Sequence, residues 1–128
     1  MLLLDIGVTM NEPDKLSLKV VKNMQYLLGL TTNQFELFQF IKFDLDSEDV
    51  SRKELHELLG IDSATIARHL TRLINIKLLT REYALSENAP PHYRYKTYTT
   101  EYYNEYVENA LLDFKESIET WQIENIES

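Results

Sequence analysis

The residues best suited to bind another molecule lie on one predicted helix near the middle of the chain. Within IDSATIARHLTRLINIKLLTRE, residues 61–82, apolar residues recur at helical spacing: Ile66, Leu70, Leu73 and Ile74. The opposite face carries small, hydroxyl and basic side chains: Ser63, Ala64, Thr65, Arg68, His69 and Arg72. Hydroxyl groups bond bases or phosphates, and guanidinium groups bond guanine or phosphate. This face therefore indicates contact with nucleic acid, and the alternative is an ordinary solvated helix surface.

The charge of the chain is unevenly distributed. The net charge is -8, but residues 51–96 contain eight Lys or Arg and five Asp or Glu, which gives +3 and leaves -11 for the remainder. Salt screens charges beyond about 10 Å, so phosphates respond mainly to the local field. The basic middle is compatible with DNA binding, and the acidic flanks should weaken non-specific binding.

The predicted elements before this helix are three further helices. The first covers about residues 15–28, with Pro13 and Asp14 as start signals and Gly29 at its end, and the second covers about 33–43. A short helix over 51–60 begins at Ser51, which has capping-box spacing to Glu54. Its buried side is expected to be Leu55, Leu58 and Leu59.

Two strands and a long helix are predicted after it. Residues 78–85 and 92–98 read as strands around the polar turn SENAPP, and Pro90 and Pro91 favour a hairpin edge or loop. From Thr99 or Thr100 to about Glu124 the pattern is helical again. The fold class expected is therefore mainly α with a small β-hairpin (α+β).

The two short helices joined by LLGID predict a helix-turn-helix. Gly60 suits the sharp reversal because it adopts positive φ at little cost, and Ile61 is expected to fill the space between the helices. Asp62 or Ser63 should cap the second helix, whose N-terminal part would enter the major groove. The first backbone N–H groups of that helix, at Ser63 and Ala64, are suited to a phosphate.

The hairpin that follows suggests a wing beside the recognition helix. His92, Arg94 and Lys96 alternate along one strand and so share a face that could lie along the sugar-phosphate backbone. The full set of expected DNA contacts is Arg52, Ser63, Ala64, Thr65, Arg68, His69, Arg72, Arg81, His92, Arg94 and Lys96.

The segment GIDSATIARHLTRL…LLTRE…HYRYKTY resembles the winged helix-turn-helix of MarR-like and TrmB-like regulators of archaea and bacteria. The following helix, YTTEYYNEYVENALLDFKESIETW, is similar to the C-terminal helix with which small archaeal regulators of this type dimerise. The resemblance covers about residues 30–121 and implies transcription regulation. The family usually has Gly just before the first wing strand, where Lys77 stands here, and Asn75 is the expected substitute in the turn.

The long helix predicts a dimer. Its stripe residues recur at spacings of three and four: Tyr103, Val107, Ala110, Leu111, Phe114, Ile118 and Trp121. A helix of this length spans roughly 36 Å, more than one small domain can cover, so a second copy is the expected partner. Two recognition helices related by a twofold axis would meet successive major grooves about 34 Å apart on an inverted repeat.

Other classes of function have little support. The chain has no Cys, its three His residues lack metal-ligand spacing, and it has no nucleophile elbow or phosphate-binding Gly loop, so we expect no enzyme, metal or cofactor. No run approaches the roughly 18 apolar residues of a membrane span, and a cytoplasmic location is expected. No residue group marks a small-molecule effector site.

Two functions therefore follow from the sequence. The first is a homodimeric, sequence-specific regulator of double-stranded DNA, with residues 1–98 as the DNA-binding domain and residues 99–128 as the dimerisation helix. The second is a winged-helix module that binds another protein and no DNA, suggested by the acidic total and the many tyrosines.

Overall fold

The computed structural model describes residues 20, 22–45 and 48–127. A helix at residues 22–28 is followed by α3 (Thr32–Gln39), which continues into the π-helical turn η1 (Phe40–Asp44). The short strand β1 (Val50–Ser51), α4 (Arg52–Leu59) and α5 (Ser63–Asn75) come next. The hairpin strands β2 (Thr80–Ser86) and β3 (Ala89–Lys96) precede α6 (Thr100–Gln122) and the π-helical turn η2 (Ile123–Glu127).

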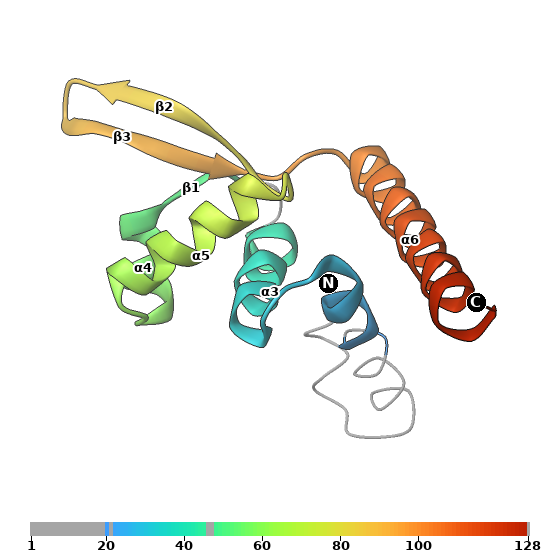
Figure 1. Cartoon of the computed structure of the whole chain (residues 1–128). Helices are drawn as coiled ribbons and strands as arrows, with labels where there is room; N and C mark the ends of the chain where they lie inside the picture. Colours follow the sequence, from blue (N-terminus) through green and yellow to red (C-terminus); the bar gives the residue numbers. More distant parts are fainter. Residues whose placement is uncertain (1–19, 21, 46–47, 128) are drawn as a thin grey trace, which may run out of the picture.

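The helices α3, α4 and α5 form the body of the molecule, and the hairpin and α6 project from it (Figure 1). The chain thus has the predicted class, mainly α with a small antiparallel sheet, and the order of elements is that of a winged helix with a long C-terminal helix. The first half of the predicted helix 15–28, with its Pro13 start signal, lies outside the described residues.

The core collects the apolar faces of the body. Ile41, Leu55, Ile66, Leu70, Leu73, Leu78 and Leu79 are fully buried, and Phe35, Leu37, Phe38, Val50 and Tyr95 are nearly so. The inner stripe predicted for α5 is confirmed, with Ile74 only partly buried. Two neighbouring predictions were wrong, because Leu58 and Ile61 are 60% and 39% exposed. Of the leucines predicted to be buried in α4, Leu55 is buried and Leu59 is partly buried.

Local sequence signals set the ends of these helices. Ser51 and Glu54 form the predicted capping box, with hydrogen bonds of 3.1 Å and 2.9 Å in the two directions. Gly60 ends α4 with φ of 68°, and Gly29 ends the helix at 22–28 with φ of 70°. Asp62, one of the two predicted caps, caps α5 by accepting from the Thr65 N–H at 3.1 Å.

The turn after α5 differs from the expectation for Asn75. Asn75 is the last helical residue, and Lys77 itself adopts the left-handed conformation, with φ of 66°. The Leu78 N–H bonds the Leu73 carbonyl at 2.9 Å, and the Lys77 N–H bonds the Ile74 carbonyl at 3.0 Å. These two bonds define a Schellman motif, in which the left-handed position is usually Gly. A lysine therefore makes the turn without the glycine of the family pattern.

The hairpin accommodates both prolines inside a strand. The sheet order β1-β3-β2 makes β3 the middle strand, but β1 pairs only with Arg94 and Tyr95. At the prolines β3 is paired with β2 alone. The register shifts between the pairs Ala84–His92 and Ser86–Ala89, so that two residues of β3 lie opposite one residue of β2. Pro90 and Pro91 occupy this bulge, a position where proline is tolerated. The turn itself is shorter than predicted, at Glu87–Asn88.

Candidate nucleic-acid interface

The N-terminal half of α5 turns a short, polar face to solvent. Ala64 and Arg68 are exposed, and Ser63, Thr65 and His69 are half-buried. The Arg68 guanidinium donates to the Thr65 hydroxyl at 3.2 Å, one turn earlier on the same helix. This hydrogen bond is weak and exposed to solvent, so the Arg68 guanidinium can replace it with a hydrogen bond to a binding partner.

Arg72 is exposed too, but it points elsewhere. Its Nη2 donates to the Gly29 carbonyl at 3.2 Å, at the end of the helix 22–28. A cation there stabilises the carbonyl end of that helix. The structure therefore separates the two arginines that the sequence placed on one face: Arg68 lies toward the start of α5, and Arg72 links α5 to the N-terminal part of the body.

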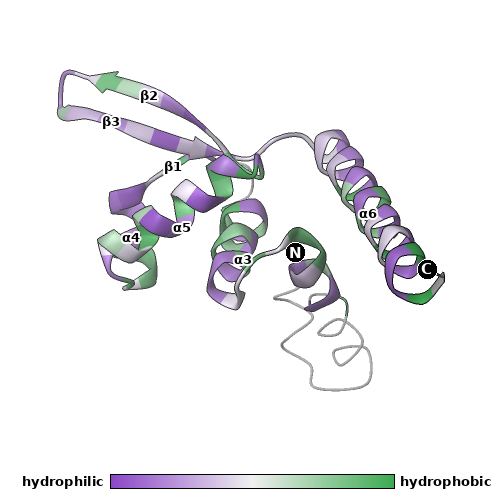
Figure 2. Cartoon of the chain, viewed as in Figure 1, coloured by the Kyte–Doolittle hydropathy of each residue, from purple (hydrophilic) through white to green (hydrophobic). Residues whose placement is uncertain are grey.

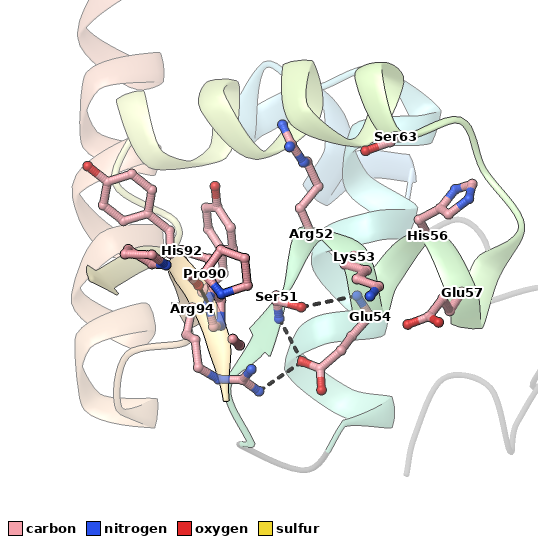
Figure 3. A pocket seen from close by; sticks show the side chains of 14 residues that line it. Ser51, Arg52, Lys53, Glu54, His56, Glu57, Ser63, Pro90, His92 and Arg94 are labelled. Atoms are coloured by element: carbon pink, nitrogen blue, oxygen red, sulfur yellow. Dashed lines mark hydrogen bonds and ion pairs between the residues drawn. The ribbon is translucent and has the colours of Figure 1, made fainter. Parts of the chain in front are cut away.

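A groove of about 840 Å³ lies between the start of α4, the start of α5 and β3. Figure 3 shows Arg52 and Ser63 on the helix side and Pro90 and His92 on the strand side. The side chains of Lys53 and His56 also line the groove. Glu54 is held by its own partners, whereas Glu57 also lines the groove and is exposed. The accessible charges of the groove are therefore Arg52, Lys53 and Glu57.

The basic residues of the wing are largely occupied by partners in the same chain. Arg94, which is 28% exposed, donates to Asp49 Oδ1 at 2.7 Å and to Glu54 Oε1 at 2.8 Å. Lys96 pairs with Glu82 at 2.7 Å, and His92 Nδ1 lies 2.9 Å from the Pro90 carbonyl. The alternation predicted for these three residues is present in β3, but the face they share is mostly neutralised within the chain.

Arg94 instead fixes the wing to the helix-turn-helix. Its bond to Glu54, a dashed line in Figure 3, joins β3 to the first turn of α4, and its bond to Asp49 joins β3 to the residue before β1. The hydrogen bond from the Ser51 N–H lowers the pKa of Glu54, and the charge of Arg94 lowers it further. The hydrogen bond to Asp49 raises the pKa of Arg94 in turn. Both groups therefore keep their charges, and the wing is held at a set angle.

The opposite face of the wing is aromatic. Tyr83 and Tyr93 face each other across the hairpin with ring centroids 5.2 Å apart, and they are 59% and 41% exposed. Arg81 stacks over Tyr93 at 4.1 Å. Tyr93 also lines the groove beside Arg52 and Ser63. The alternation of Arg81, Tyr83 and the paired Tyr93 was the signal that could have placed this cluster there.

The residues predicted for dimerisation fall into two groups. Tyr103 packs inside its own chain, edge-on to Phe38 with centroids 5.6 Å apart, because α6 begins against the body. Val107 and Ala110 are half-buried. The others are exposed, from 42% to 58%: Leu111, Phe114, Ile118 and Trp121. They recur along the far part of α6, where Figure 2 shows apolar residues interspersed with polar ones.

Comparison with known proteins agrees with this architecture. No protein-family model and no curated protein matches the sequence. The structure is similar to a solved one described as "Possible transcriptional regulator from Methanosarcina mazei Go1", with a TM-score of 0.71. The match covers 86% of this chain and 89% of that chain, at 15% sequence identity. The fold is winged-helix-like. At this identity the similarity extends to the fold alone.

Across residues 22–45 and 48–127 we find no group of three His, Asp or Glu side chains placed to share a metal ion. None of the described helices combines the length and the apolar character needed to cross a membrane.

Proposed function

We propose that the protein is a homodimeric transcriptional regulator that binds a specific sequence of double-stranded DNA. The observation that carries the proposal is the polar N-terminal face of α5, with half-buried Ser63 and Thr65 and exposed Arg68. Ser63 also lines the groove that contains Arg52 and Lys53. A helix presented in this way fits the major groove, and cations at the start of the preceding helix suit the adjacent phosphates.

The proposed division of labour follows the two parts of the chain. Residues 1–98 would bind DNA, and residues 99–128 would join two subunits through Leu111, Phe114, Ile118 and Trp121. Burying such side chains between two copies of α6 contributes about 1.5–3 kcal/mol for each one fully covered. The same twofold arrangement would present two copies of α5 to an inverted repeat.

The wing has a smaller part in this proposal than the sequence suggested. Arg94 and Lys96 hold the wing's own structure, so we assign the accessible wing contacts to Arg81, His92 and Tyr93. A tyrosine or histidine beside the backbone bonds phosphate or sugar without sequence preference. Specificity would then rest on α5.

The experiment is selection of binding sites from random duplexes, followed by titration of the selected site at several salt concentrations. We expect an inverted repeat and an affinity that falls steeply with salt. Failure to enrich any duplex would contradict the proposal.

A second function is favoured by one specific observation. Arg72, Arg94 and Lys96 all bond within the chain, and the chain as a whole is acidic, with a net charge of -8. A winged-helix module that binds a protein partner through the groove and the Tyr83–Tyr93 pair would have these properties. It predicts that no duplex is enriched, and the same selection distinguishes it.

A further inference from the structure

Three tyrosines at the start of α6 bond three successive carbonyls of the turn between α5 and β2. The hydroxyl of Tyr106 donates to the Ile76 carbonyl at 2.7 Å, and that of Tyr102 to the Lys77 carbonyl at 2.6 Å. The hydroxyl of Tyr103 donates to the Leu78 carbonyl at 2.7 Å. We call this set, Tyr102, Tyr103 and Tyr106, the tyrosine clamp.

The three carbonyls that the clamp bonds lie directly after α5. They follow the last turn of α5, where the helix can no longer supply N–H partners, and the Schellman motif satisfies only the carbonyls before them. Water could satisfy exposed carbonyls equally well. Three tyrosines from one helix instead fix α6 to the end of the proposed recognition helix.

Tyr103 is the centre of the clamp. Its hydroxyl also accepts from the Tyr98 N–H at 3.0 Å, so one oxygen joins the β3–α6 connection to the α5–β2 turn. Its ring packs on Phe38, and the ring of Tyr102 stacks on Tyr98 with centroids 3.9 Å apart. Burial raises the pKa of Tyr103 to about 12, and burial also raises the pKa of Tyr102 and Tyr106. All three hydroxyls therefore stay protonated donors at neutral pH.

From this geometry we infer that the tyrosine clamp positions the recognition helix relative to the dimerisation helix, and so sets the half-site spacing that the dimer accepts. The inference rests on the proposed function. Apart from the hydroxyl bonds, the Tyr103 ring contacts Phe38 and Lys42, whose Nζ lies 5.3 Å from the centre of that ring. Apolar and cation–π contacts tolerate sliding, whereas three directional hydrogen bonds to adjacent carbonyls do not.

The clamp separates two tasks that one helix performs. The far part of α6 carries the exposed apolar stripe, and its first two turns carry the clamp. A dimer formed by the stripe would thus have its two α5 helices at a distance defined through the clamp. Loss of the hydroxyls should leave dimerisation intact and loosen the spacing.

The test uses a variant in which Tyr102, Tyr103 and Tyr106 are all changed to Phe, which keeps the rings and removes the hydroxyls. Tyr26→Phe, at an 82% exposed tyrosine, is the matched control. Wild type and variants are titrated with inverted repeats whose half-sites are moved apart or together by one to four base pairs. We expect the affinity of wild type and control to fall at least about tenfold for each base pair by which the spacing departs from its optimum. The affinity of the triple variant should vary by less than about threefold over the same series.

A second measurement needs no DNA. Because the chain has no Cys, Thr71→Cys on α5 and Asn109→Cys on α6 allow two spin labels to be attached at defined sites, with labelled subunits diluted into unlabelled ones. The width of the distance distribution should at least double in the triple variant. Tyr102→Phe alone serves as the second variant if the triple one does not fold, and it should broaden the distribution by a smaller factor.

The two readouts distinguish the possible failures. An unchanged distance distribution in the Phe variants, or an unchanged spacing preference, overturns the positioning role of the clamp. A wild type that enriches no duplex overturns the proposed function, while the distance distributions still decide whether the clamp holds α6 on the body.

Discussion

Arg68 and Arg72 are one helical turn apart, yet their surroundings assign them different tasks. Arg68 contacts only the Thr65 hydroxyl of its own helix, whereas Arg72 bonds a carbonyl 43 residues away in the sequence. We propose the first as a contact for bases or phosphates, whereas the second joins α5 to the end of the helix at residues 22–28.

Alanine substitutions should separate the two tasks. Arg68→Ala should lower affinity for the selected duplex by about 10–100-fold, the effect of losing one specific base contact, and leave the melting temperature unchanged. Arg72→Ala should lower the free energy of unfolding by about 0.5–1.5 kcal/mol, since an exposed, charged hydrogen bond is lost. Anisotropy titration and urea unfolding measure the two effects. An equal loss of affinity in both variants with no loss of stability would contradict this assignment.

Asp62 modifies the phosphate site that the sequence suggested at the start of α5. Its carboxylate accepts from the Thr65 N–H and places a negative charge beside the helix N-terminus, where it repels a phosphate. Asp62→Asn keeps a good capping side chain and removes the charge. We expect affinity for duplex DNA to rise about threefold to tenfold at low salt, with a smaller rise at high salt. Titration at two salt concentrations is the measurement, and an unchanged affinity would show that phosphates lie away from this helix end.

At the scale of elements, short-range signals predicted the structure well. The Ser51–Glu54 capping box and the left-handed Gly60 involve residues within one turn, so the pattern alone specifies them. The partners of Arg72 and Arg94 lie 43 and 45 residues away, and spacing along the chain carries no information about them. The tyrosine clamp was missed for the same reason, because its hydroxyls and the carbonyls that they bond lie 25 to 30 residues apart in the sequence. The DNA and dimer contacts of the predicted residues remain predictions.

The turn after α5 carries a backbone strain that can be tested. Lys77 adopts φ of 66°, which costs a residue with a Cβ roughly 1–2 kcal/mol. Lys77→Gly should raise the free energy of unfolding by about 0.5–1 kcal/mol, because the greater freedom of Gly in the unfolded chain offsets part of the gain.

Gly60→Ala is the matched control for this strain. It has φ of 68° and no atom within 4 Å of the place where a Cβ would stand, so conformation alone decides its effect. We expect it to lower the free energy of unfolding by about 1 kcal/mol. Urea unfolding measures both variants, and a destabilised Lys77→Gly would indicate that the lysine side chain stabilises the turn.

The clamp gives the protein a sensitivity to high pH. Tyr103 has its pKa raised from 10 to about 12 by burial, so the unfolded chain loses this proton first as the pH rises. Stability is therefore retained below pH 10 and lost progressively between about pH 10 and 12, by on the order of 2 kcal/mol from this residue. Urea unfolding at pH 9 and pH 11.5 measures the loss. Tyr103→Phe should be less stable at pH 9 and should lose less on going to pH 11.5, and an equal loss in both proteins would exclude Tyr103 as the source.

At the scale of the whole molecule, the acidic charge is concentrated on the helix proposed to join two subunits. Residues 99–128 contain eight carboxylate side chains and Lys115 as the only cation, which gives -7 of the total -8. Two such helices side by side repel each other, and the apolar stripe from Leu111 to Trp121 has to outweigh that repulsion. The remainder of the chain is close to neutral, with Arg52 and Lys53 in the groove near the proposed DNA.

Salt should therefore act on the two proposed associations in opposite directions. Screening weakens the repulsion between the α6 helices, so the dimer should tighten by about threefold to tenfold between 0.05 and 0.5 M salt. The same change should weaken DNA binding by several orders of magnitude, because counterions compete for the phosphates. Analytical ultracentrifugation of the free protein and anisotropy titration of pre-formed dimer measure the two separately.

Two sets of variants test whether repulsion between the α6 helices causes the salt dependence of the dimer. Changing Glu105, Glu108, Glu116 and Glu119 to Gln removes most of the repulsion, so the dimer should become nearly independent of salt while DNA binding keeps its steep slope. Phe114→Ala with Trp121→Ala removes apolar area and should weaken the dimer by 100-fold or more, on the scale of about 1.5–3 kcal/mol for each side chain. A dimer that weakens as salt rises would show that ion pairs join the subunits. Since Lys115 is the only cation on α6, such ion pairs would join Lys115 to a carboxylate of the other α6, or join α6 carboxylates to cations on another element.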